Sequence, residues 1–328
     1  MGLCLRVDES AQNLGHEIMR ALLAFTISAC ASAALAATEY RPFAVGGFDL
    51  SRDTDDFRSE IYSAGGGMYL NDGNKDRFGY RHIESHYSSP GFSMHGEADA
   101  LFGSVAFGEK QSTEVSGELT HSRLENDKDR WLGWGQVTAT PTALSNIEVR
   151  YETNWVDSRN ALDRGIAYQA LTVAGDYQFT DRFDLAGVIG RLNFSDDNER
   201  SLYRAKATYL ISETYGVNMY VRSRRYSNSD PYSGNYFSPD RYYDYLGGIG
   251  IRKRLSFVRG TVVGNIDWGR QSVDGVESPA RTWQIRVESW VGQRFTYSIG
   301  TGFNATAGVG GGDDYEYRYT SASASWRF

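Results

Sequence analysis

The sequence predicts an all-β protein, a transmembrane antiparallel up-and-down β-barrel of about 16 strands. Two observations lead to this prediction. After residue 40, stretches of about a dozen residues alternate apolar with polar side chains, and breaks rich in Gly, Asp and Asn separate them. The polar face of these stretches carries more charge than the dry core of a β-sandwich accepts. A barrel with lipid outside and water inside accepts charge on its inward face.

The alternation is clearest over residues 146–155, where Ile147, Val149 and Tyr151 share one face and charged residues stand between them. Because side chains of a strand point alternately to its two faces, a period of two assigns one face to lipid and the other to water. Residues 283–288 repeat the pattern. The chain therefore offers amphipathic strands rather than amphipathic helices.

Counting such stretches gives an even number of strands, as single-chain barrels require. The expected strands span residues 41–52, 57–70, 76–87, 94–107, 111–124, 130–140, 146–157, 165–177, 182–194, 201–211, 216–227, 240–253, 258–271, 281–292, 295–306 and 315–328.

Composition agrees with this class. The chain has 328 residues with 14% aromatic residues, 22 Tyr, 36 Gly and only 6 Pro, which suits long strands and interfacial aromatic girdles. A mean hydropathy of −0.48 is compatible with a membrane barrel, because each strand shows only half of its residues to lipid. The formal charge of −7 argues against nucleic acid as a partner.

The N-terminal segment predicts export from the cytoplasm. Residues 21–36 form an apolar run that closes with Ala34-Leu35-Ala36, the small-x-small pattern of a signal-peptidase site. We therefore expect residues 1–36 to be a cleaved signal peptide and residues 37–328 to be one barrel domain. The polar stretch before Met19 leaves that methionine open as the true start.

The two cysteines bear on processing and on metal binding. Cys4 and Cys30 both precede residue 37, so the mature chain has no disulfide and no thiolate metal site. Residues 27–30 also fit a lipoprotein signal, which would place a lipid on Cys30 instead. The Asp-rich links lack ordered ligand spacing, so we expect no metal and no cofactor.

The C-terminal residues 321–328 alternate small polar with apolar or aromatic side chains up to Phe328. This ending resembles the closing strand of bacterial outer-membrane β-barrels. The resemblance implies an outer-membrane-type barrel in the outer membrane of a Gram-negative bacterium. It also implies two partners, the lipid of that membrane and the barrel-assembly machinery, which recognises the final strand. With both termini periplasmic, the odd-numbered links face outward.

The expected register turns an array of charged side chains toward the lumen. Early strands contribute mainly acids, while residues 201–225 contribute mainly bases, and opposed charges across a water-filled channel would set its preference for solutes. The alternative is that each group pairs with a neighbour and merely fills a polar lumen. The candidates for a translocation path are Glu97, Asp99, Glu114, Glu118, Glu148, Arg150, Glu152, Arg222, Arg224, Asp244, Arg252, Asp267, Arg286 and Glu288, with Arg204, Lys206 and Arg259 beside them.

The longest expected link, residues 227–240, concentrates aromatic residues among Asp and Asn. Aromatic faces stack on the C–H surfaces of sugars while amides and carboxylates take hydroxyls, so this composition fits a carbohydrate path. An interfacial aromatic girdle is the competing interpretation. The candidate carbohydrate contacts are Tyr232, Tyr236, Phe237, Asp240 and Tyr242.

Residues 235–242, Asn-Tyr-Phe-Ser-Pro-Asp-Arg-Tyr, lead into the Gly-rich stretch 247–252. This segment resembles a loop in the C-terminal outer-membrane porin domain of exopolysaccharide secretion proteins, those that export poly-N-acetylglucosamine or cellulose. The resemblance covers residues 41–328. It implies a non-enzymatic conduit that exports a polysaccharide. Those proteins carry tetratricopeptide arrays that this chain lacks, so a separate periplasmic tetratricopeptide-repeat scaffold is an expected partner.

Two other functions remain open at this point. One is a general or solute-selective diffusion porin, which would need a long inward-folded loop, and only residues 227–240 are long enough. The other is a barrel enzyme that acts on lipid, for which His82, Ser85 and His86 would have to converge on the lipid face.

Overall fold

The computed structural model describes residues 40–70, 76–108, 112–290, 292–307 and 314–328. In these residues it contains the expected closed antiparallel barrel of sixteen strands. The strands are β1 (Arg41–Asp53), β2 (Arg58–Tyr69), β3 (Arg77–Ser89), β4 (Phe92–Phe107), β5 (Thr113–Leu124), β6 (Asp129–Thr142), β7 (Ser145–Trp155), β8 (Ala167–Thr180), β9 (Phe183–Phe194), β10 (Glu199–Ser212), β11 (Val217–Asn228), β12 (Arg241–Leu255), β13 (Gly260–Val273), β14 (Val276–Ser289), β15 (Phe295–Ala307) and β16 (Asp314–Arg327).

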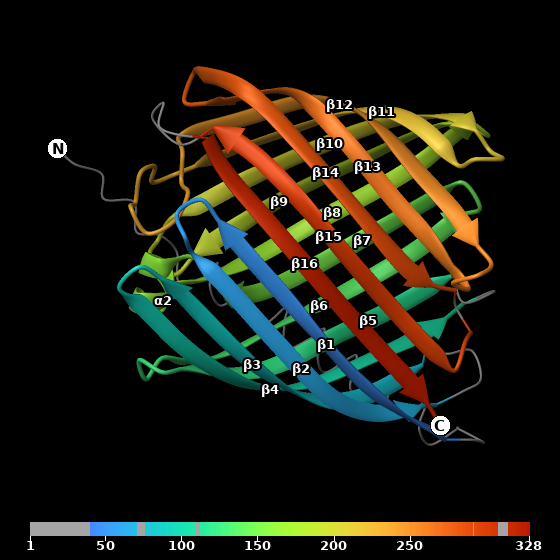
Figure 1. The fold of residues 1–328 in the computed structure, drawn as a ribbon, viewed down its shortest axis with the longest axis horizontal. Helices are drawn as coiled ribbons and strands as arrows, with labels where there is room; N and C mark the ends of the chain where they lie inside the picture. The colour runs from blue at the N-terminus through green and yellow to red at the C-terminus, as the bar shows by residue number, and fades with distance from the viewer. Residues whose placement is uncertain (1–39, 71–75, 109–111, 291, 308–313) are drawn as a thin grey trace.

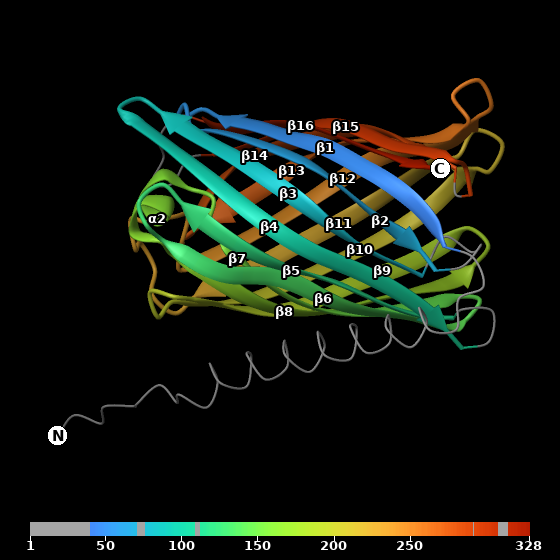
Figure 2. The same cartoon turned by 90° about the horizontal axis from the view of Figure 1, so that it is seen from below.

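Each strand pairs with its neighbours in the sequence, and β1 closes the barrel by pairing with β16. The strands run obliquely to the long axis of the barrel (Figures 1 and 2). Closure pairs the backbone groups of both terminal strands, which matters because an unpaired strand edge is not tolerated in lipid. The expected fold class is therefore confirmed.

Most boundaries shift by one to three residues, and two larger differences have identifiable reasons. β14 begins at Val276, earlier than expected, because Asp274 (φ 51°) and Gly275 (φ 88°) make a two-residue turn that pairs Val273 directly with Val276. The β7–β8 link is longer than expected, because residues 159–164 form the short helix α2 (Arg159–Arg164).

The two ends of the barrel differ. One end carries α2 and the link between β11 and β12, residues 229–240. The C-terminus lies at the opposite end (Figure 2). We call the first end the α2 end. No helix among the described residues is long and apolar enough to cross a membrane. The expected signal peptide, the alternative start at Met19 and the lipidation motif at Cys30 lie outside the described residues.

One face of the wall carries a belt of exposed large apolar side chains, and we call it the outer face. In β9, for example, Leu185 and Ile189 are exposed while the alternate residues Ala186 and Val188 are half-buried. The belt continues on other strands with Leu101, Val149, Leu171, Val221, Ile249, Ile266, Ile285 and Ile299. Because this apolar face must meet lipid, the alternate residues form the inner face.

At the α2 end the barrel contains a small hydrophobic core, which we call the mouth core. It comprises Tyr87, Met94, Leu124, Leu132, Trp155, Leu162 and Ala167. Leu162 of α2 is fully buried in it, and Trp155 donates its indole N–H to the hydroxyl of Ser122 at 3.0 Å. The helix ends at Gly165 (φ 69°), whose N–H bonds the carbonyl of Leu162. The β7–β8 link is thus anchored against strands β3–β6.

We expect Leu162→Ala to loosen this link. Removing a fully buried leucine side chain costs about 2–4 kcal/mol, since a cavity is left where the side chain packed. Equilibrium unfolding and limited proteolysis of the refolded barrel, with cleavage mapped to residues 156–166, measure the effect.

Leu144→Ala is the matched control, because Leu144 is exposed in the short β6–β7 link. Equal protease resistance of wild type and Leu162→Ala would show that the mouth core does not hold the link.

Candidate functional site

Most of the charged residues expected in the lumen do lie on the inner face. On β7, for example, Arg150 and Glu152 alternate with the exposed Val149, and Glu152 accepts a hydrogen bond of 2.6 Å from Tyr168 on the inner face of β8. The same alternation on the neighbouring strands places the following on the inner face: Glu114, Glu118, Glu148, Arg150, Glu152, Arg222, Arg224, Asp244, Arg252, Asp267, Arg286 and Glu288.

Glu97 and Asp99 are the exceptions, because the structure places them on the outer face. They share their face of β4 with Leu101, which is 61% exposed, while Ala98 and Ala100 between them are buried. The expectation was wrong because β4 extends into the mouth core. There the inside of the barrel is dry and the outside meets water, so the usual relation of apolar and polar faces is inverted.

Two lumenal arginines are held by buried carboxylates. Arg224 forms an ion pair of 2.8 Å with Asp244, and Arg222 one of 3.0 Å with Asp267. Both carboxylates are almost fully buried, at 1% and 3% exposed. Tyr242 bridges the first pair, since it accepts from Arg224 at 2.8 Å and donates to Asp244 at 3.0 Å. These pairs are therefore part of the wall.

Two further bases on β10 lack such partners. Among the described residues, Arg204 and Lys206 have no carboxylate within ion-pair distance, and the ammonium of Lys206 lies 4.0 Å from the ring centroid of Tyr220. Arg200 lies over the rings of Phe194 and Tyr226. The inner face of β10 therefore presents two bases that feel the charges of Asp184, Asp244 and Asp267 but form no direct ion pair with a described residue.

Acidic residues dominate a different arc, on β5 and β7. Glu118 pairs with Arg81 at 2.6 Å and Glu152 pairs with Arg150 at 2.8 Å. Glu148 has only a hydrogen bond of 3.0 Å from the amide of Gln136. Arginines therefore neutralise two of these acids, and Glu148 is the acid of the three that stays free to act on a charged solute.

The five aromatic and acidic residues of the expected carbohydrate contact are only partly brought together. Tyr236 stacks on Phe194 with ring centroids 4.5 Å apart, and Tyr242 is buried and stacks on Tyr226 at 4.5 Å. Each ring therefore has one face occupied by its stacking neighbour. The side chains that remain exposed at the α2 end are Tyr232, Phe237 and Asp240.

The β11–β12 link contacts the β7–β8 link at the α2 end. Ser158 donates to the carbonyl of Asn235 at 2.6 Å, and Asn160 donates to the carbonyl of Gly234 at 2.8 Å. The amide of Asn235 also donates to Asp196 of the β9–β10 link at 3.2 Å. Sequence reasoning missed these contacts, because a side chain bonded to a distant backbone carbonyl leaves no mark in the sequence pattern.

Asp157 of the β7–β8 link has a raised pKa. Protein atoms surround it within the mouth although water reaches it. This burial, together with the negative charges of Asp49 and Asp53, raises the pKa of Asp157 to about 6.

The residues considered for a lipid-directed enzyme do not converge. Ser85 occupies the inner face of β3 with Tyr87, whereas His82 and His86 occupy the outer face with the exposed Tyr80. The wall of the barrel therefore separates the hydroxyl from both imidazoles. Within the described part of the chain, no group of three or more His, Cys, Asp or Glu is arranged to hold a metal ion.

Comparison with known proteins shows the fold. No protein-family model and no curated protein sequence match the chain. A solved structure described as a bacterial polysaccharide outer membrane secretin is similar, with a TM-score of 0.66 and 10% identity over 88% of this chain and 98% of the other. The chain therefore has an outer-membrane-type barrel fold.

Two further solved structures match less well. Pseudomonas aeruginosa OprD has a TM-score of 0.44 and 8% identity over 89% of this chain and 96% of the other. The KdgM porin, solved in complex with disordered oligogalacturonate, has a TM-score of 0.38 and 9% identity over 87% and 99%.

We expect Arg224→Ala to destabilise the barrel by about 3–5 kcal/mol, because it leaves the buried carboxylate of Asp244 without its partner. The double variant Arg224→Leu/Asp244→Leu should recover most of that loss, since it removes both charges. Urea unfolding of protein in lipid vesicles measures both free energies. Equal losses for the single and double variants would contradict a buried ion pair that holds the wall.

We expect the ion selectivity of the barrel to change with pH near 6. Above that pH Asp157 is ionised and favours cations, and below it the neutral carboxyl favours them less. Reversal potentials in planar bilayers between pH 5 and 7 measure the permeability ratio. Asp157→Asn should remove the step, and a step that persists in this variant would assign the titration to another group.

Proposed function

We propose that this protein is a non-enzymatic conduit through which a polysaccharide chain crosses the outer membrane of a Gram-negative bacterium, with the α2 end at the cell surface. The observation that carries the proposal is the inner face. It presents unpaired bases on β10 and acids on β5 and β7 around the space that sixteen strands enclose.

A glycan suits this lining. Hydroxyl groups exchange hydrogen bonds with carboxylates, guanidinium groups and amides, so a chain can move along a polar wall without a fixed binding site. At the α2 end, the exposed rings of Tyr232 and Phe237 and the carboxylate of Asp240 offer sugar stacking and hydrogen bonding. The likeness in fold to a polysaccharide outer membrane secretin agrees with this cargo.

The partners follow from the same proposal. The alternating residues of β16 put Trp326 on the lipid side and small serines on the inner face, which suits a segment read by the barrel-assembly machinery. A periplasmic tetratricopeptide-repeat scaffold would deliver the glycan to the end opposite α2.

A diffusion porin is the second candidate, and one observation favours it. The β7–β8 and β11–β12 links bond to each other at the α2 end through Ser158 and Asn160. Linked loops at a channel mouth restrict the size of what passes, which is what a general or solute-selective porin needs.

We expect deletion of the gene to abolish surface polysaccharide and to leave glycan in the periplasm, because the conduit across the outer membrane is missing. Complementation with wild type should restore the surface glycan. Arg204→Gln/Lys206→Gln should restore less of it if the glycan is charged, and Arg225→Gln/Arg281→Gln on the outer face is the control with the same change in charge. Quantification of surface and periplasmic glycan measures the outcome.

Unchanged surface glycan in the deletion strain would contradict export. Liposome swelling with sugars of increasing size then tests the diffusion porin. A sharp size limit that widens in Ser158→Ala/Asn160→Ala would assign the bonded links as the filter.

A further inference from the structure

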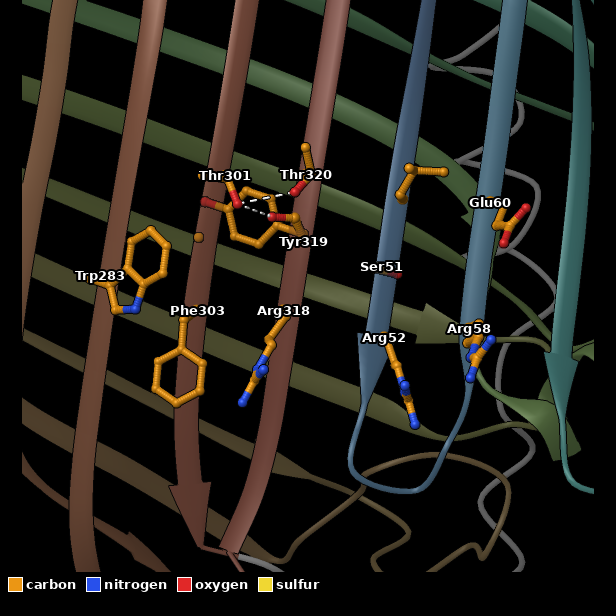
Figure 3. A pocket seen from close by; sticks show the side chains of 12 residues that line it. Ser51, Arg52, Arg58, Glu60, Trp283, Thr301, Phe303, Arg318, Tyr319 and Thr320 are labelled. Carbon is orange, nitrogen blue, oxygen red and sulfur yellow. Dashed lines mark hydrogen bonds between the residues drawn. The ribbon is translucent and has the colours of Figure 1, made fainter.

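Three arginines lie side by side on the outer face, across the seam at which the barrel closes. Arg52 of β1 is directly opposite Arg318 of β16 on one side and directly opposite Arg58 of β2 on the other. All three side chains are exposed, and Figure 3 shows them in a row near the β1–β2 link. Like charges directly opposite one another destabilise a sheet, so anions beside this row stabilise it.

Aromatic residues continue the same row on the next two strands. Phe303 of β15 is directly opposite Arg318, and Trp283 of β14 is directly opposite Phe303. Together with Leu50, one step closer to the apolar belt, these residues line a shallow groove on the outer face (Figure 3). The groove therefore has a cationic side and an apolar side.

The row sits where the outer face changes from apolar to polar. Phe48 and Leu50 of β1 lie on its belt side, whereas Asp56 and Glu316 lie on its link side. This is the depth at which a lipid headgroup meets its acyl chains, so the occupant of the groove has to be amphipathic.

Nearby carboxylates pair with two of the three arginines and leave the third without an ion pair. Arg52 pairs with Asp56, and Arg318 pairs with Glu316 at 2.9 Å. Arg58 forms no ion pair with any described residue, and Glu60 is the sole acid among the groove residues. A guanidinium has five donors, so Arg52 and Arg318 keep donors for a second anion beside their carboxylates.

We propose that this arginine row binds the phosphate groups of a phosphorylated membrane lipid, whose acyl chains cover Leu50, Phe303 and Trp283. The planar guanidinium matches phosphate with two parallel hydrogen bonds, and three of them in register fit a headgroup with more than one phosphate. The bound phosphate removes the repulsion across the β1–β16 seam. The site requires only that the barrel lies in a membrane, so it is independent of the cargo.

The test compares lipid binding by the full chain and by Arg52→Gln/Arg58→Gln/Arg318→Gln. Native mass spectrometry follows release from micelles that contain diphosphoryl lipid A, lipid A stripped of its phosphates, or phosphatidylcholine. We expect the wild type to retain the phosphorylated lipid alone. The triple variant should bind it about tenfold or more weakly, the order expected when charge-assisted hydrogen bonds are lost.

Arg191→Gln/Arg225→Gln/Arg281→Gln is the matched control, because these outer-face arginines are not opposite one another and it removes the same charge. A second readout is the melting temperature. Without phosphorylated lipid the melting temperature of each protein serves as its own baseline, since the arginine-row variant loses two ion pairs along with the repulsion. Added lipid should raise only the wild type and the control.

Three results would overturn the proposal. The first is equal retention of diphosphoryl lipid A by wild type and the arginine-row variant. The second is equal loss of retention in the matched control, which would reduce the effect to net charge. The third is displacement of the lipid by millimolar inorganic phosphate, which would make free phosphate the ligand.

Discussion

The closure of β1 onto β16 is the constraint on which the rest of this structure depends. In lipid, an unpaired backbone N–H or C=O has no water to bond, so an open sheet of these sixteen strands is not a viable membrane protein. Closure through the register that pairs Gly47 with Ser323 creates an inside and an outside. Closure thereby assigns the alternating side chains of each strand to two environments, with lipid on one face and water on the other.

The kind of side chain that faces outward changes along the barrel axis. In the belt, apolar side chains such as Ile189 and Val221 face outward. At the α2 end the wall encloses the mouth core, so Met94 and Leu162 face inward and polar residues such as Glu97 face out. The barrel is thus a membrane protein over part of its length and resembles a soluble protein at one end. The mouth core in turn anchors the link that carries Asp157.

The charged residues of the lumen fall into two groups. Asp244 and Asp267 are buried and stabilise the barrel wall, since each forms an ion pair with an arginine and accepts a hydrogen bond from a hydroxyl group. Arg204 and Lys206 form no direct ion pair with a described residue, so they are available to a charged solute in the lumen. The proposed lipid site on the outer face differs, because Arg52 and Arg318 are paired with carboxylates and only Arg58 forms no ion pair with a described residue.

The sequence by itself determined the number of strands, their order and the two-faced character of each, because a period of two is a local property that survives without tertiary contacts. It also put Glu148 and Arg150 on the water side. Only the tertiary structure decided that Glu97 and Asp99 face outward. It also decided that Tyr236 and Tyr242 stack on neighbouring aromatic rings, and that the β7–β8 and β11–β12 links form hydrogen bonds with each other. Each of these depends on a partner far away in the chain or on height above the membrane, and alternation along one strand encodes neither.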